Sequence, residues 1–182
     1  MIFISAGHTA EGIRKDPGAV GSNGLTEASV TREFRNLVTA ELDKRKVPYI
    51  KDVDSERLGE YLARINTGNA SVVLEFHCDA SENKLAVGTT ALIEADADRL
   101  DRAFAKELSD ACSLILGVKN RGVKSEAESH RGSLGLMKES GILCLLELFF
   151  ISNLEDQAKY QANKSRLAVA IADIIIRYEN LI

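Results

Sequence analysis

The chain has little of what marks several large classes of protein. Proline occurs only twice in 182 residues, while hydrophobic residues make up 45% and charged residues 27%. This balance is typical of an ordered globular α/β domain and excludes a disordered or low-complexity protein. The formal net charge is only −4, which argues against a surface that tracks nucleic-acid phosphates. One domain is expected at this length, and folding should bury roughly 70% of the surface that the unfolded chain exposes.

The cysteines and the N-terminus also lack the marks of a secreted or membrane protein. The three cysteines are odd in number, lack CxxC spacing and fall within apolar segments, namely Cys78, Cys112 and Cys144. A secreted disulfide framework is therefore not expected. Residues 1–5 are followed at once by Ala6-Gly7-His8, without a basic leader or an apolar core of signal-peptide length. No stretch reaches membrane-spanning length, so we expect synthesis in the cytoplasm without a signal peptide and no membrane insertion.

Strand-like and helix-like segments alternate along the chain. Short apolar or β-branched runs predict strands at residues 2–5, 48–53, 71–76, 87–94 and 142–150. Helical spacing of apolar residues predicts helices at about 27–46, 55–68 and 98–116, and a last helix that a capping box of Ser152 and Glu155 would begin. Residues 119–141 are polar, with weak helix signals near 133–139. This order predicts a single α/β domain with a largely parallel central sheet and helices on both faces.

Two histidines follow predicted strands. His8 comes after the strand at 2–5, and His77 comes after the strand at 71–76. Because the carboxyl ends of parallel strands meet at one edge of a sheet, both imidazoles are expected there. Glu27, in the first turn of the next helix, can reach the same edge. The alternative for Glu27 is a favourable charge at a helix N-terminus, an effect of about 0.3–1 kcal/mol.

Two imidazoles and one carboxylate are a donor set that suits Zn²⁺. They fill three of the four positions that this ion prefers, which leaves the fourth for a water whose pKa falls to about 7. The set His8, Glu27 and His77 therefore predicts a hydrolase with one zinc ion per chain. Cys78 lies on the opposite strand face from His77. A packed thiol is favoured there over a fourth ligand, which would close the site.

Glu147 lies inside the most apolar predicted strand, in Leu145-Leu146-Glu147-Leu148-Phe149-Phe150. An unpaired ionised carboxylate would be strongly destabilised there by desolvation. Beside a metal-bound water it could accept the proton, and apolar surroundings would raise its pKa toward that of a general base. We therefore predict that Glu147 is the catalytic base. The alternative is a structural ion pair with an arginine.

Three further positions are weaker candidates. Glu75 shares a strand face with His77 and is a candidate to hydrogen-bond that ligand, although a structural ion pair is at least as well supported. His130 and Arg131 lie in the polar segment before the last strand and are candidates for substrate contact. An exposed loop histidine is the favoured interpretation of His130. Residues 16–19 are expected to form a turn that shapes the loop between His8 and Glu27.

Blocks of the sequence, in this order, resemble the zinc-dependent N-acetylmuramoyl-L-alanine amidases of the amidase 3 group, found in bacterial cell-wall hydrolases and phage endolysins. The matching blocks are Gly7-His8, Asp16-Pro17-Gly18-Ala19, Glu27, Phe76-His77-Cys78-Asp79-Ala80, and Glu147 with Phe150-Ile151-Ser152-Asn153. The likeness runs nearly end to end, so residues 1–182 are expected to form one catalytic domain of this type. It implies a zinc-peptidase-like three-layer sandwich in which His8, Glu27 and His77 bind zinc. It also implies that Glu147 is the catalytic glutamate.

Three positions depart from the family pattern. Ala6 stands where an Asp commonly precedes Gly-His, Asp79 replaces a usual Asn, and Phe149 occupies a position usually held by Gly. None of these changes removes a predicted ligand or the predicted base. The Phe149 exchange is expected to reshape the pocket next to Glu147.

The resemblance implies hydrolysis of the amide between the lactyl group of N-acetylmuramic acid and L-alanine in peptidoglycan. Peptidoglycan is the expected partner, with no nucleic acid and no obligate protein partner. The missing signal peptide favours delivery to the wall by holin-type release or by lysis. Two alternatives remain, a zinc peptidase that cleaves the stem peptide and a catalytically silent wall-binding domain.

Overall fold

The computed structural model describes residues 1–9, 11–12, 15–129 and 134–182. Within them one sheet has the strand order β2-β1-β3-β6-β4-β5. The strands are β1 Ile2–Ala6, β2 Tyr49–Lys51, β3 Val72–Asp79, β4 Thr89–Ile93, β5 Asn120–Ser125 and β6 Ile142–Phe150. Every neighbouring pair is parallel except β4 and β6. The largely parallel sheet confirms the expected fold class.

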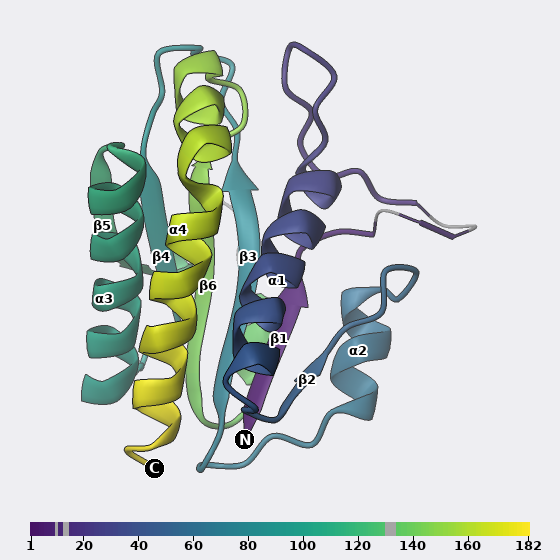
Figure 1. Ribbon diagram of the computed structural model, residues 1–182, viewed down its shortest axis with the longest axis vertical. Coiled ribbons are helices and arrows are strands. Elements are labelled where there is room, and N and C mark those ends of the chain that lie inside the picture. The colour runs from purple at the N-terminus through teal and green to yellow at the C-terminus, as the bar shows by residue number, and fades with distance from the viewer. Residues whose placement is uncertain (10, 13–14, 130–133) are drawn as a thin grey trace.

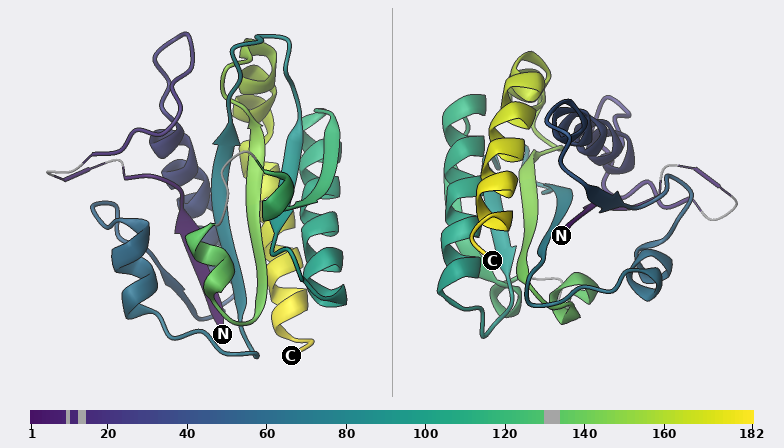
Figure 2. Two further views of the ribbon diagram at one scale, coloured as in Figure 1. Left: turned by 180° about the vertical axis from the view of Figure 1, so that it is seen from behind. Right: turned by 60° about the horizontal axis from the view of Figure 1, so that its bottom comes forward.

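Helices lie on both faces of this sheet. One face is covered by α1 Glu27–Lys44, α3 Arg99–Leu116 and α4 Leu154–Glu179 (Figure 1). The other face carries the short α2 Leu58–Arg64 and a 3-10 helix, η2 Gly135–Lys138, as the view from behind shows (Figure 2). None of the described helices is long and apolar enough to cross a membrane.

Side chains alternate between the two faces of the sheet along each strand, so the core is divided into two clusters. On β3, Val72, Leu74, Phe76 and Cys78 pack in the larger cluster under the three long helices. Val73 faces the other way and packs in the smaller cluster, with residues of α2 and η2. Farther along the strands, this second face carries buried polar side chains, which are Ser5, Glu75, His77 and Glu147. The thinly covered face therefore holds the predicted site.

The helix α1 begins where the sequence supplies a cap. The Thr26 side chain accepts a hydrogen bond from the Ser29 backbone N–H at 3.3 Å, which satisfies one of the free donors at the helix start. Val30, Phe34 and other apolar residues of the helix are buried against the sheet. This cap fixes Glu27 at the first position of the helix, above the carboxyl ends of the strands.

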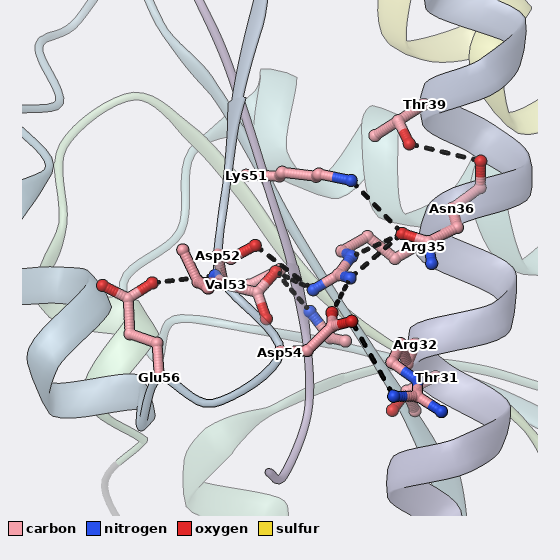
Figure 3. A network of polar contacts seen from close by, with 12 residues as sticks. Thr31, Arg32, Arg35, Asn36, Thr39, Lys51, Asp52, Val53, Asp54 and Glu56 are labelled. Carbon is pink, nitrogen blue, oxygen red and sulfur yellow. Dashed lines mark hydrogen bonds and ion pairs between the residues drawn. The ribbon is translucent and has the colours of Figure 1, made fainter. Parts of the chain in front are cut away.

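Arg35 on α1 is a buried exception to the apolar pattern, with 1% of its surface exposed. Its guanidinium pairs with Asp52 at 2.8 Å and with Asp54, as Figure 3 shows. The Asp52 carboxylate also accepts a hydrogen bond from the Ala6 backbone N–H at 3.2 Å. This network joins α1 to the segment after β2 and to the end of β1.

Several element boundaries differ from the sequence predictions. The strand β3 continues to Asp79, so His77 lies inside the strand and not after it. The helix α2 begins at Leu58, three residues later than the predicted start at residue 55, and Asp54 ahead of it is paired with Arg35.

Two more differences lie in the second half of the chain. The N-cap of α4 is Asn153, whose side chain accepts from the Asp156 N–H at 3.0 Å. The predicted cap, Ser152, instead accepts a hydrogen bond from the Ser81 N–H at 3.0 Å. The polar segment after Lys119 contains a strand, β5, that the sequence analysis did not predict.

Candidate metal centre and active site

His8 follows β1 directly and has a backbone conformation that is rare for a side-chain-bearing residue. Its φ is +69°, in the left-handed region that costs a non-glycine residue energy and often marks functional sites. The turn points the imidazole Nε2 toward the Glu27 carboxylate at 3.1 Å. The outer nitrogen, Nδ1, lies 2.9 Å from an oxygen of Asp16. His8 is therefore held between two carboxylates.

Glu27 is 1% exposed and lies between the two imidazoles. One oxygen lies 2.9 Å from Nδ1 of His77 and accepts from the Cys78 N–H at 3.0 Å. The other faces His8 and accepts from the Ala19 N–H at 2.9 Å. Burial alone would raise the pKa of Glu27, but the hydrogen bonds from His77 and His8 outweigh it and hold that pKa well below its usual value.

His77 is 7% exposed and also contacts a carboxylate on each side. Its Nδ1 faces Glu27, and its Nε2 lies 2.9 Å from Glu75. Burial alone would lower the pKa of His77, but the hydrogen bonds to Glu27 and Glu75 outweigh it and raise that pKa to about 10. The pocket therefore stabilises positive charge between these side chains, as a cation site must.

The donor set and spacing of His8, Glu27 and His77 suit a metal ion. Each offers one ligand atom, and these atoms lie within 4.8 Å of one another. Ligand atoms around a tetrahedral zinc ion are about 3.4 Å apart, so small side-chain shifts bring the three to a common ion. Two nitrogens and one oxygen also leave a fourth position open. The structure thus brings together the three residues that the sequence predicted as ligands.

Both histidines have a carboxylate on the nitrogen that points away from Glu27. Glu75 takes this place for His77, and the Ser5 hydroxyl donates a hydrogen bond to Glu75 at 2.9 Å. Asp16 takes it for His8. A carboxylate on the outer nitrogen fixes the orientation and protonation of a metal-binding imidazole. The sequence indicates Glu75 as such a partner, but it places Asp16 only in a turn, because the Asp-Pro-Gly pattern gives no sign of this contact.

Two glycines leave room for the imidazoles. A Cβ built on Gly7 would lie 2.3 Å from the His77 ring. On Gly18, whose φ is +63°, a Cβ would lie 2.5 Å from the His8 ring and 2.7 Å from a Glu27 oxygen. Both distances are far below van der Waals contact. The loop backbone therefore packs directly on the predicted ligands.

Glu147 lies on the strand directly next to that of His77. The two residues are register partners on β6 and β3, and neighbouring strands are about 4.8 Å apart. Glu147 is 2% exposed, and its charge favours the protonated form of His77. It also lines a cavity of about 360 Å³, while His8 and His77 line a separate hollow together with Glu75. The predicted base is thus next to the predicted metal ligands and borders a space large enough for part of a substrate.

The other singled-out residues have mixed outcomes. Cys78 is fully buried in the larger core cluster, as the packed-thiol interpretation predicts. Phe149 is fully buried too, with its ring stacked on Tyr160 at 4.8 Å. The expectation that Phe149 reshapes the pocket beside Glu147 is therefore wrong, because this side chain packs under α4. The candidate substrate contacts His130 and Arg131 lie outside the described residues.

Solved structures with the same fold cover nearly the whole chain. The catalytic domain of the N-acetylmuramoyl-L-alanine amidase CwlV from Bacillus (Paenibacillus) polymyxa has a TM-score of 0.78 at 22% identity, covering 100% of this chain and 98% of that one. A putative N-acetylmuramoyl-L-alanine amidase from Neisseria meningitidis has a TM-score of 0.75 at 26% identity, with 97% and 93% covered. The CwlD amidase from Clostridioides difficile, in complex with the GerS lipoprotein, has a TM-score of 0.79 at 20% identity, with 100% and 98% covered.

A comparison with curated protein sequences gives no match. The family model described as N-acetylmuramoyl-L-alanine amidase, Amidase_3, matches residues 2–177. This range includes both histidines, Glu27 and Glu147. The chain therefore belongs to the amidase 3 family of N-acetylmuramoyl-L-alanine amidases.

Proposed function

We propose that this amidase is zinc-dependent and hydrolyses the amide between the lactyl group of N-acetylmuramic acid and L-alanine in peptidoglycan. One observation carries the proposal: the facing ligand atoms of His8, Glu27 and His77 lie within 4.8 Å of one another, with Glu147 on the adjacent strand. Family membership supports the bond that is cut. The donor set supports one zinc ion per chain.

His8, Glu27 and His77 would hold the ion through the atoms that now face one another. When bound, zinc supplies Lewis acidity, which polarises a carbonyl group and acidifies water. Asp16 and Glu75 are positioning residues in this proposal, because each contacts the outer nitrogen of one imidazole. They keep the inner nitrogens directed at the ion.

Glu147 is the proposed general base and acid. Its carboxylate takes a proton from the attacking water and returns it to the L-alanine nitrogen as the amide breaks. Its burial, with 2% of the residue exposed, and its place beside His77 in the strand register support this role. The cavity beside it gives the scissile amide access from solvent.

The test is hydrolysis of purified peptidoglycan by the purified protein, with analysis of the newly exposed ends. We expect new N-terminal L-alanine, loss of activity with a chelator, and recovery with added zinc. Glu147→Gln should reduce the rate at least about 100-fold, the scale of general acid–base catalysis. Glu155→Gln is the matched control, because Glu155 is an exposed residue paired with Lys159. Equal rates for the two variants would contradict the role of Glu147.

The same experiment separates the alternatives. A stem-peptide peptidase would release fragments while L-alanine stays attached to the sugar. A silent wall-binding domain would bind the walls without dissolving them. Activity of the protein alone would also support the prediction that it needs no obligate protein partner. Delivery by holin-type release or lysis remains a separate proposal, tested by locating the protein before and after lysis.

A further inference from the structure

The cavity beside Glu147 has walls of different chemical character. Thr90 and Leu92 on β4 line it together with Glu147 on β6. Arg121 and Lys124 on β5 line its other side. Its volume of about 360 Å³ lies within the range of small-ligand sites. A substrate whose amide lies at Glu147 would therefore meet two cationic side chains in the same cavity.

Arg121 is held in place without an acidic partner. Its guanidinium carbon lies 5.0 Å from the centre of the Phe150 ring, and Nη1 donates to the Val87 carbonyl at 3.4 Å. No carboxylate of the described residues lies within ion-pair distance of it. A guanidinium has five N–H donors, so most of them remain for a ligand. Stacking on an aromatic ring also limits the freedom that this side chain would lose on binding.

Lys124 is half-buried and likewise has no ion-pair partner among the residues that the structure describes. Glu128, an acidic residue of the same cavity, is hydrogen-bonded to the Ser125 backbone N–H at 2.9 Å and to the Ser125 hydroxyl at 3.0 Å. These hydrogen bonds, and to a smaller extent the nearby charge of Lys124, lower the pKa of Glu128. Asp79 and Glu128 also line this cavity, so its charge is mixed, but neither Arg121 nor Lys124 is in an ion pair with a described residue. The β5 wall therefore favours an anionic group of a ligand.

The sheet geometry sets which anionic group can reach this wall. Glu147 is paired with Thr90 on β4, and β5 is the next strand. Two strand spacings are about 10 Å. An extended peptide advances about 3.5 Å per residue, and the long side chains of Arg121 and Lys124 extend toward the cavity from the other side. A charged group on the residue that follows L-alanine would therefore lie near the side chains of Arg121 and Lys124.

We propose that Arg121 and Lys124 bind a free α-carboxylate on the residue that follows L-alanine, in stem peptides that continue from that residue through its side-chain carboxyl group. The inference rests on the proposed function for the placement of the scissile amide at Glu147. The two residues would make the enzyme prefer stem peptides in which this carboxylate is free over those in which it is amidated. They are specificity residues and take no part in proton transfer.

The test measures binding without turnover. Isothermal titration calorimetry compares two dipeptides, L-alanyl-D-glutamate blocked as a methylamide at the γ-carboxyl, with the α-carboxyl either free or amidated. We expect the wild-type protein to bind the free carboxylate at least about tenfold more tightly, the scale of charged hydrogen bonds. The Arg121→Gln, Lys124→Gln double variant should lose this preference while binding the amide form as the wild type does.

Lys119→Gln is the matched control. Lys119 lies beside Arg121 and Lys124 in a neighbouring hollow but does not line the cavity with Glu147. It should keep the preference. Equal affinity of the wild type for the two peptides would overturn the inference. The inference would also be overturned if Lys119→Gln lost the preference as fully as the double variant, because that result would indicate a diffuse charge effect. If the double variant unfolds, Arg121→Lys is used, which keeps the charge and should weaken the preference by removing the planar donor pair.

This inference and the proposed function can fail separately. A protein that cuts the lactyl–alanine amide but binds both dipeptides equally overturns only the carboxylate site. A protein that prefers the free carboxylate but cleaves the walls elsewhere keeps the carboxylate site and overturns the proposed function.

Discussion

Replacing Gly18 by alanine tests directly whether the loop packs on a metal site. Gly18 has a φ of +63°, and an added Cβ would lie 2.5 Å from the His8 ring and 2.7 Å from a Glu27 oxygen. Carbon atoms in contact are about 3.5–4.0 Å apart. The imidazole or the loop must therefore move by about 1 Å. Coordination distances tolerate changes of about 0.2 Å, so Gly18→Ala should weaken zinc binding at least about tenfold.

Gly24 provides a matched control in the same loop. Its φ is +82°, and an added Cβ would have nothing within 4 Å. Both alanine variants are destabilised by the left-handed conformation, by about 1–2 kcal/mol. For a chain of this size we expect the Tm of each to fall by about 2–8 °C. Only Gly18→Ala adds the steric displacement of a predicted ligand, so the difference between the variants isolates the effect on the site.

The assay is zinc affinity by competition with a coloured chelator, with Tm measured in parallel. Gly24→Ala should bind zinc like the wild type despite its lower Tm. If Gly18→Ala binds zinc as tightly as Gly24→Ala, His8 and Glu27 do not hold the ion together. That result would refute the reasoning about the metal centre.

Three further predictions concern the site and its support. Glu75→Gln should weaken zinc binding by about 10- to 100-fold in chelator competition because it changes the acceptor on His77; unchanged affinity would argue for a structural role only. Removing zinc should lower the Tm by about 5–10 °C relative to protein with free zinc at 100 times its Kd, and an unchanged Tm would mean that zinc does not bind the folded state. Arg35→Met should lower the free energy of unfolding in urea by about 3–5 kcal/mol because it leaves Asp52 buried and unpaired; the more exposed Arg45→Met should cost below about 1 kcal/mol, and equal losses would contradict the importance of burial.

The sequence was informative where a residue type conflicts with its surroundings. Glu147 stands out because it interrupts an apolar strand, and the strand has the predicted bounds of residues 142–150. His8 and His77 stand out because each lies near the carboxyl end of a strand. In a parallel sheet this shared position brings distant residues together. The grouping of His8, Glu27 and His77 could therefore be predicted without coordinates.

The features that the sequence did not predict depend on contacts between segments that are distant along the chain. The strand β5 is polar and half-exposed, and Gly122 has a φ of +81° within it, so it lacks the alternation by which strands are recognised. Its place beside β4 makes Arg121 and Lys124 part of the cavity wall. The contact of Asp16 with His8 likewise depends on how the loop folds back. No local pattern records either arrangement.

The helix α1 is attached to the end of β1 at three points. Glu27 contacts His8, the Thr31 hydroxyl donates to the Gly7 carbonyl at 2.8 Å, and Arg35 holds the Asp52 carboxylate that binds the Ala6 N–H. Helix and strand end therefore behave as a single rigid unit that bears two of the three ligands. In the loop between them, the contacts with these two ligands come from residues 16–19. The tip of this loop near Gly24 is consequently a place where extra residues, or a fused tag, could be introduced while the chemistry of the centre is preserved.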